Sequence, residues 1–240
     1  MTNTILENEE LSANTLFNFT KKREYLLLNL EKNFRPRLVL EEYKPILGKE
    51  YKAAVPMTCF CDIRLSNISV HIKEYGNYGI GLKKKWGISK GLNPVQYISS
   101  KDSYFLTSFR KMTDDLKPDT NSFMNVFVFF KPYKGEQNGK NRNFYNEREW
   151  RYVPSEIDVD KMMLTGEEYE DTLKQNNINE ILQQPEYTLA FLFSDIKYIV
   201  IDKDNDKDVI IETMLKTPSV TEKEISHIIF ITNEMIKNDI

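Results

Sequence analysis

The chain has 240 residues, of which 40% are hydrophobic and 12% aromatic, so it is long enough to bury a full core and has an ordinary globular composition. Its formal net charge of -3 and pI near 5.6 exclude a global attraction to nucleic acid or to an anionic membrane surface. No apolar run approaches the roughly 20 residues that cross a bilayer, and residues 1–11 lack the features of a secretory signal. We therefore expect a cytoplasmic protein with no membrane partner.

Strands and helices mix in the first hundred residues. Residues 16–20 alternate apolar and polar side chains, as in a half-buried strand, and Thr20 is placed to cap the helix that follows. Ser66 is placed to cap a short helix. The predicted strands cover 16–20, 57–61, 78–82 and 95–98, and the predicted helices cover 21–32 and 66–74.

In the second half, a helix is predicted from Asp102 or Ser103, because the apolar residues that follow recur with a 3.6-residue period. Residues 123–130 are apolar nearly throughout, and Val126 and Val128 favour a strand there. Thr232 is placed to cap a terminal helix. The other predicted elements are strands at 150–153, 196–201 and 228–231 and helices at 167–184 and 206–215.

The expected fold class is α+β, because strands and helices mix without strict βαβ alternation. We expect one domain over residues 1–240. Residues 1–12 are expected to be flexible. Residues 135–143, rich in Gly, Asn and Lys, are expected to form a long loop.

Five of the nine glycines lie between Gly76 and Gly91. Such crowding indicates sharp turns or close approach of another group, and we interpret it as one wall of a ligand cleft. The segment matches neither the P-loop nor the dinucleotide-binding fingerprint. Its four lysines are better interpreted as a solvated turn than as a local anion site. They are Lys83, Lys84, Lys85 and Lys90.

Two carboxylates, Glu147 and Glu149, are two residues apart just before or within a predicted strand, so they point to one face, whereas Arg148 and Trp150 point to the other. Paired carboxylates suit stabilisation of a cationic centre such as an oxocarbenium ion. The alternative is a solvated strand face on which Arg148 and Arg151 balance the acids.

Histidine and cysteine chemistry is limited in this chain. Cys59, Cys61 and His71 supply three potential metal ligands but no fourth, so no metal is expected, and the cysteines are interpreted as reduced thiols. His71 precedes the glycine cluster and is placed to line a pocket, whereas His227 is interpreted as structural. No Ser-His-Asp or Cys-His arrangement is evident from the spacing.

Four segments of the chain carry a family resemblance. They are VPMTCFCDIRLSNISVHIKEYGNYGIGLKKKWGISKGLNPVQY at 55–97, LFNFT at 16–20, FYNEREWRYVP at 144–154 and FSDIKYIVI at 193–201. Together they resemble the AbiGi family of abortive phage infection proteins. The resemblance implies a bacterial protein of phage defence, described as the antitoxin half of a toxin–antitoxin pair. It thus implies a cognate toxin, encoded nearby, as partner.

A more distant resemblance is to the ADP-ribosyltransferase-like superfamily. It implies a central split sheet, antiparallel or mixed, with flanking helices, NAD as cofactor, and a protein or nucleic-acid acceptor. By position, Asn18 takes the first place of the superfamily pattern, Tyr78 or Tyr75 the second, and Glu149 the third, while Glu147 completes a Glu-x-Glu motif. The chain departs from the pattern in having Asn18 where His is usual, and an amide cannot change charge near neutral pH.

Two functions of different classes follow. In the first, the protein is an NAD-dependent ADP-ribosyltransferase of an abortive-infection system. Its catalytic residues would be Glu149, Glu147 and Tyr78, and its cofactor-binding residues would be Asn18, Thr20, His71, Tyr75, Gly79 and Gly81. In the second, it is a non-catalytic antitoxin that neutralises a partner toxin by protein contact. A third and weaker hypothesis is a sensor that binds a nucleotide or a phage protein.

Overall fold

A computed structural model describes residues 13–99, 103–115, 120–137, 139–154, 162–218 and 220–238. The chain divides into two compact units, each described separately below. Unit 1 comprises Met1–Asn33, Phe60–Gly91 and Phe191–Ile240, and unit 2 comprises Phe34–Cys59 and Leu92–Ala190. The predicted flexibility of residues 1–12 falls outside the described residues, and the single domain stays a prediction.

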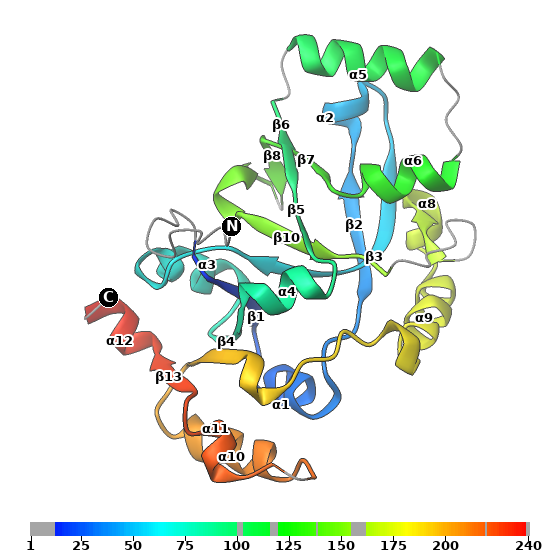
Figure 1. The fold of residues 1–240 in the computed structure, drawn as a ribbon. Coiled ribbons are helices and arrows are strands. Elements are labelled where there is room, and N and C mark those ends of the chain that lie inside the picture. The colour runs from blue at the N-terminus through cyan, green and yellow to red at the C-terminus, as the bar shows by residue number, and fades with distance from the viewer. Residues whose placement is uncertain are drawn as a thin grey trace, which may run out of the picture. The chain divides into compact units, whose positions relative to one another are not determined.

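Unit 1 contains a mixed sheet in the order β13-β12-β4-β1-β3 (Figure 1). Its strands are β1 (Thr15–Thr20), the end of β3 (Lys52–Cys61), β4 (Tyr78–Lys83), β12 (Ile196–Ile201) and β13 (Ile229–Thr232). β12 and β13 are parallel, whereas β4 runs antiparallel to both β1 and β12. β1 and β4 therefore lie side by side along their whole length.

Helices lie on both faces of this sheet. They are α1 (Arg23–Lys32), α3 (Ile68–Tyr75), α4 (Lys84–Ser89), α10 (Asp206–Leu215), α11 (Glu222–Ile225) and α12 (Asn233–Asn238). Phe17, Val200 and Ile231 of the strands share a buried cluster with Ile72 of α3 and Ile236 of α12, so α3 and α12 cover that face. α1 and α10 pack against each other and α1 contacts β4.

Unit 2 is built around β3. It pairs antiparallel with β2 (Arg37–Glu42) and with β11 (Leu164–Thr165), and it neighbours β10 (Glu149–Tyr152). The further elements are α2 (Lys44–Leu47), β5 (Asn93–Pro94), β6 (Gln96–Ile98), α5 (Tyr104–Asp115), α6 (Thr120–Phe127), β7 (Phe130–Pro132), β8 (Lys134–Gln137), β9 (Lys140–Asn143), α8 (Gly166–Tyr169) and α9 (Thr172–Ile181). Its core is mostly aliphatic and includes the rings of Tyr43 and Phe127, whose centroids are 4.5 Å apart.

The α+β class is confirmed, and several elements match closely. The predicted strand at 196–201 and helix at 206–215 have the observed bounds. The hydroxyl of Ser103 accepts a hydrogen bond from the Leu106 amide at 3.2 Å, and that of Thr232 accepts one from the Met235 amide at 3.1 Å, so both residues cap as predicted. No helix in the described ranges is long and apolar enough to cross a bilayer.

Two predictions in the middle of the chain are wrong. The strand predicted over 123–130 is mostly helix α6, in which Met124 and Phe127 are buried while Val126 is exposed, the spacing of a helix face. The long loop predicted over 135–143 is largely a β-hairpin of β8 and β9. Gly139, with φ of +71°, supplies the left-handed residue that its turn requires.

The remaining corrections concern the residues at which helices begin. The single helix predicted over 167–184 is two helices, because the Asp171 carboxylate accepts hydrogen bonds from the amides of Leu173 and Lys174 and starts α9. Thr20 does not cap α1, since its hydroxyl donates to the Lys22 carbonyl. Ser66 lies within a 3-10 turn ahead of α3 and does not cap it.

Candidate functional site

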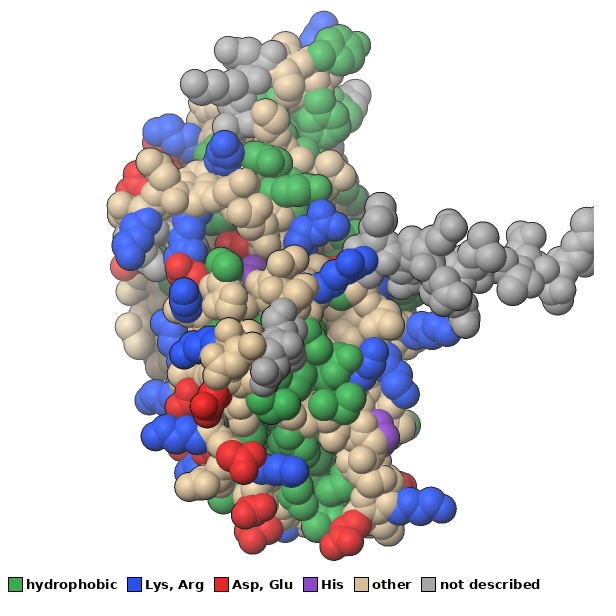
Figure 2. All heavy atoms as spheres, turned by 90° about the vertical axis from the view of Figure 1, so that its left-hand side faces the viewer, with side chains coloured by type: hydrophobic (Ala, Val, Ile, Leu, Met, Phe, Trp, Pro, Cys, Tyr) green, Lys and Arg blue, Asp and Glu red, His purple; other side chains and the backbone are tan. Residues whose placement is uncertain are grey.

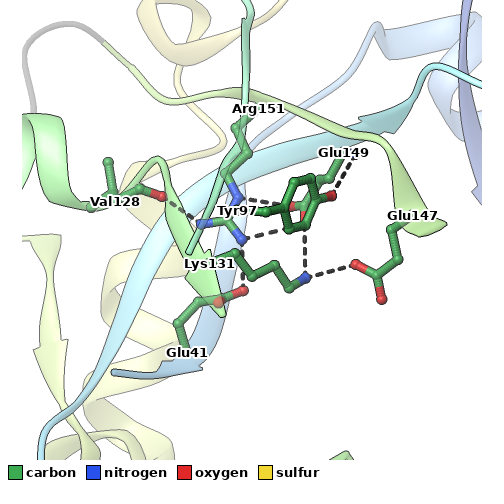
Figure 3. A network of polar contacts seen from close by, with 7 residues as sticks. All are labelled: Glu41, Tyr97, Val128, Lys131, Glu147, Glu149 and Arg151. Carbon is green, nitrogen blue, oxygen red and sulfur yellow. Dashed lines mark hydrogen bonds and ion pairs between the residues drawn. The ribbon is translucent and has the colours of Figure 1, made fainter. Parts of the chain in front are cut away.

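The most distinctive polar feature of unit 2 is a buried cluster of charges, here called the ionic cluster. It consists of Glu41 on β2, Lys131 on β7, Glu147 in the turn before β10, and Glu149 and Arg151 on β10. Glu149 and Arg151 are two residues apart on a strand and so face the same side. Figure 3 shows the side chains pointing toward one another.

Glu149 lies at the centre of the ionic cluster, with only 6% of its surface exposed. Its Oε1 accepts a hydrogen bond from Arg151 Nε at 2.7 Å. Its Oε2 accepts one from Lys131 Nζ at 2.7 Å and a longer one from Arg151 Nη2 at 3.3 Å. Both carboxylate oxygens are therefore occupied by cations of the protein itself.

Arg151 is fully buried, and each of its three nitrogens has an acceptor. Besides Glu149, it donates through Nη2 to Glu41 Oε1 at 3.0 Å and through Nη1 to the Val128 carbonyl. Lys131 is also buried, with 9% of its surface exposed. Its Nζ, which donates to Glu149, also donates to Glu147 Oε2 at 2.8 Å and so links the two carboxylates. Because unpaired buried charges are costly, these ion pairs connect β2, β7 and β10 within unit 2.

The charges of the ionic cluster reinforce one another's ionised states. Burial raises the pKa of the Glu149 carboxyl, but the adjacent Arg151 and Lys131 outweigh it and hold that pKa well below its usual range. For Lys131 and Arg151, burial lowers the pKa, and Glu149, with Glu41, outweighs it. All three groups therefore stay charged near neutral pH.

Two neutral groups border Glu149. Burial raises the pKa of the Cys59 thiol well above its usual range, and the negative charge of Glu149 adds to this, so the thiol stays protonated and is a poor nucleophile. The hydroxyl oxygen of Tyr97 accepts a hydrogen bond from the Glu149 amide at 2.8 Å. This bond fixes the backbone at the start of β10 from outside the sheet ladder.

The predicted site residues divide between the two units. Glu147 and Glu149 lie in unit 2, and the structure brings both carboxylates onto Lys131, as their predicted common face requires. The other seven lie in unit 1: Asn18, Thr20, His71, Tyr75, Tyr78, Gly79 and Gly81. Each set is therefore considered within its own unit.

Within unit 1 the seven residues do not share one face of the sheet. Asn18 pairs with Ile80 and Thr20 with Tyr78, so the side chains of Asn18, Thr20 and Tyr78 lie on one side. Gly79 and Gly81 face the opposite side. His71 and Tyr75, whose rings are 5.3 Å apart, lie on α3, which covers that opposite side.

Packing accounts for the glycines of β4. A Cβ at Gly79 would lie 2.7 Å from the ring of Phe19, and one at Gly81 would lie 2.6 Å from the ring of Phe17. Gly76 has φ of +127°, and a Cβ there would meet the Thr20 carbonyl at 2.1 Å. Aromatic rings from β1 explain Gly79 and Gly81, and the backbone of Thr20 with the positive φ explains Gly76, while a role of the glycines in ligand binding stays a prediction.

Tyr78 has a structural partner. Its hydroxyl donates to Asp206 Oδ2 at 3.0 Å, and Asp206 Oδ1 lies 2.9 Å from Arg23 Nη1. Burial, followed by the bond to Asp206, raises the pKa of Tyr78 to about 12. The three side chains join β4 to α1 and α10.

Comparison with known proteins identifies the family. A model of the family described as "Putative abortive phage resistance protein AbiGi, antitoxin" matches residues 32–202. The chain belongs to the AbiGi family. A Lactococcus lactis subsp. cremoris protein named "Abortive phage resistance protein AbiGi" is 30% identical over 179 residues, covering 62% of this chain and 72% of that relative. No solved structure matches.

The AbiGi match contains every member of the ionic cluster, and it also contains β4 with its glycines. Asn18 and Thr20 precede the matched residues, and α10 with Asp206 follows them. The family match confirms the resemblance to AbiGi, whereas the resemblance to ADP-ribosyltransferases stays a prediction.

The partners of Glu149 were missed in the sequence. Arg151 was expected to balance the acids, but on a solvated face, and the structure buries it completely. Lys131 stands in an apolar stretch between Phe130 and Pro132, and a cation in such a stretch is the signal that was available. Among the described residues, no group of three or more His, Cys, Asp or Glu side chains is arranged to hold a metal ion.

Proposed function

We propose that this AbiGi protein is an antitoxin that neutralises a cognate toxin by direct protein contact, and that Glu149 has a structural role in it. The observation that carries the proposal is the burial of Glu149 between two cations. The family's description as an antitoxin supports the biological role.

Catalysis through Glu149 would be costly in this arrangement. A carboxylate that binds a ribose hydroxyl and stabilises an oxocarbenium ion must offer an oxygen to the substrate. Both oxygens of Glu149 already accept hydrogen bonds from Arg151 or Lys131. Releasing them would leave buried charges unpaired, at a cost of about 3–5 kcal/mol. A structural role explains the same contacts without this cost.

An NAD-dependent ADP-ribosyltransferase is the second candidate, and one observation favours it. Glu147 and Glu149 converge on a single amine, as the two carboxylates of a Glu-x-Glu motif would. In this candidate Glu149 binds the ribose next to nicotinamide. The acceptor is a protein or a nucleic acid.

Co-expression with the product of the neighbouring gene tests the first candidate. We expect the two proteins to purify together and the chain to restore growth of cells that the neighbouring product inhibits. A chain that neither binds that product nor restores growth would contradict the proposal.

Incubation of the purified chain with labelled NAD and a cell extract tests the second candidate. The antitoxin proposal predicts neither transfer of ADP-ribose nor release of nicotinamide above the level of the same extract and NAD incubated without the chain. NAD turnover that a folded Glu149→Gln variant loses would replace the antitoxin proposal with the transferase.

A further inference from the structure

Unit 1 contains an open hollow of about 260 Å³ on its sheet, where β1 begins and β3 has just ended. Its walls include Asn14, Phe17, Ile63, Arg64, Leu65 and Tyr198. None of these residues belongs to the ionic cluster or to the predicted NAD site. The inference below is therefore independent of the proposed function.

Aromatic rings form the apolar wall of the hollow. The ring of Phe17 is nearly parallel to that of Tyr198, at 5.9 Å and 16°, and to that of Phe19, at 5.7 Å and 14°. Phe17 and Tyr198 both pair with Gly81, one from each neighbouring strand. Because Gly81 has no side chain, the Phe17 ring can lean over β4, and Tyr198 is left half-buried at the hollow.

Two cations accompany these rings. Arg64 is exposed on the wall of the hollow. Lys197 Nζ donates to Asn14 Oδ1 at 3.2 Å and lies 5.1 Å from the centroid of the Tyr198 ring. Figure 2 views the side on which β13 and α12 lie in Figure 1, and hydrophobic side chains gather in its lower half, bordered by lysine and arginine side chains on either side and by acidic side chains on the left and below.

Stacked aromatic rings with cations beside them suit a ligand that has both a planar ring and an anionic group. Bases stack on aromatic side chains, and arginine and lysine bind phosphate oxygens. The volume is slightly below the roughly 300–1,000 Å³ of pockets that enclose drug-sized ligands, so it suits one base and not a dinucleotide. From these features we infer that the hollow binds a nucleoside monophosphate, with its base against Tyr198 and its phosphate at Arg64 and Lys197.

Titration calorimetry of the full chain with AMP, adenosine and inorganic phosphate, each alone, tests this inference. Arg64→Gln removes the phosphate contact, Tyr198→Leu removes the stacking ring, and Arg37→Gln changes an exposed arginine of unit 2 as control. We expect AMP to bind more tightly than adenosine or phosphate. Arg64→Gln should lower the affinity for AMP about tenfold and leave the affinity for adenosine unchanged. Tyr198→Leu should lower the affinity for both ligands about tenfold, as expected for the loss of one base-stacking contact.

Three outcomes would overturn the inference. They are no detectable binding of AMP at millimolar concentration, an AMP affinity that Arg64→Gln leaves unchanged, and phosphate binding as tight as AMP binding, which would indicate a simple anion patch. If Tyr198→Leu does not fold, as judged by thermal melting, the comparison of AMP and adenosine on Arg64→Gln still decides.

Discussion

At the scale of single residues, the protein's unusual feature is a charged side chain buried as deeply as any in its core. Arg151 is fully buried, and Glu41 and Glu149 both pair with it. Such pairs contribute little net stability compared with apolar packing, but removing one partner is costly because the other charge stays buried. Arg151 is therefore a residue on which the fold of unit 2 depends.

Substitution of Arg151 tests this dependence. We expect Arg151→Ala to lower the free energy of unfolding by about 3–5 kcal/mol, since Glu149 and Glu41 lose their common partner. Urea denaturation followed by circular dichroism measures the change. Arg37→Ala, at an exposed arginine on β2, should stay within about 0.5 kcal/mol of the unsubstituted protein. Equal effects of the two substitutions would contradict the structural role of Arg151.

The low pKa of Glu149 predicts a dependence of stability on pH. In the folded chain the carboxyl has a pKa well below its ordinary value of 4.5, so the folded state binds its proton less readily than the unfolded state. The resulting stability is present above about pH 4.5 and is lost as the pH falls toward the folded pKa. Denaturation at a series of pH values from 7 to 3 should show this loss. A Glu149→Gln variant, although less stable at pH 7, should show a shallower decline; an equally steep one would contradict the prediction.

At the scale of elements, contacts between strands explain what local patterns did not. The glycines of β4 were interpreted as a ligand cleft, because a sequence shows the missing side chains but not the rings of Phe17 and Phe19 that fill the space. The strand at 196–201 was predictable from its β-branched residues alone. The apolar run at 123–130 was not, because such a run has no period that separates a strand from a helix.

The contact between β1 and β4 predicts a result for Gly81→Ala. The new Cβ would lie 2.6 Å from a ring carbon of Phe17, and overpacking of this kind costs about 1–3 kcal/mol. Thermal and urea denaturation measure the loss. A double-mutant cycle with Phe17→Leu supplies the control, since a smaller side chain relieves the collision and the two effects should then not add. Strict additivity would contradict the packing explanation of the glycine.

The ionic cluster shows the same limit of sequence reasoning. The alternation of β10 places Glu149 and Arg151 on one face, which local spacing predicts. Lys131 lies 18 residues before Glu149 in the sequence, and Glu41 lies 110 residues before Arg151, so only the tertiary fold of unit 2 brings them together. The carboxylate pair was thus predictable as a pair, and its burial between cations was not.

At the scale of the whole molecule, β3 contributes residues to both compact units. The backbone of β3 is continuous from Lys52 to Cys61, so the two units share this strand. We therefore expect one cooperative transition, as for a single domain. Each unit contains one tryptophan, Trp86 in unit 1 and Trp150 in unit 2, so fluorescence of Trp86→Phe and Trp150→Phe variants follows the units separately. Coincident urea midpoints are expected, and separate midpoints would indicate two independent domains.

The central claim is that this AbiGi protein neutralises a toxin by contact and that the Glu149 carboxylate does no chemistry. Growth rescue by Glu149→Gln, in cells that express the product of the neighbouring gene, tests it most directly, with circular dichroism confirming that the variant is folded at the growth temperature. We expect each folded molecule of the variant to rescue growth as well as the unsubstituted chain does. Loss of rescue by a folded variant that still binds the neighbouring product would contradict it.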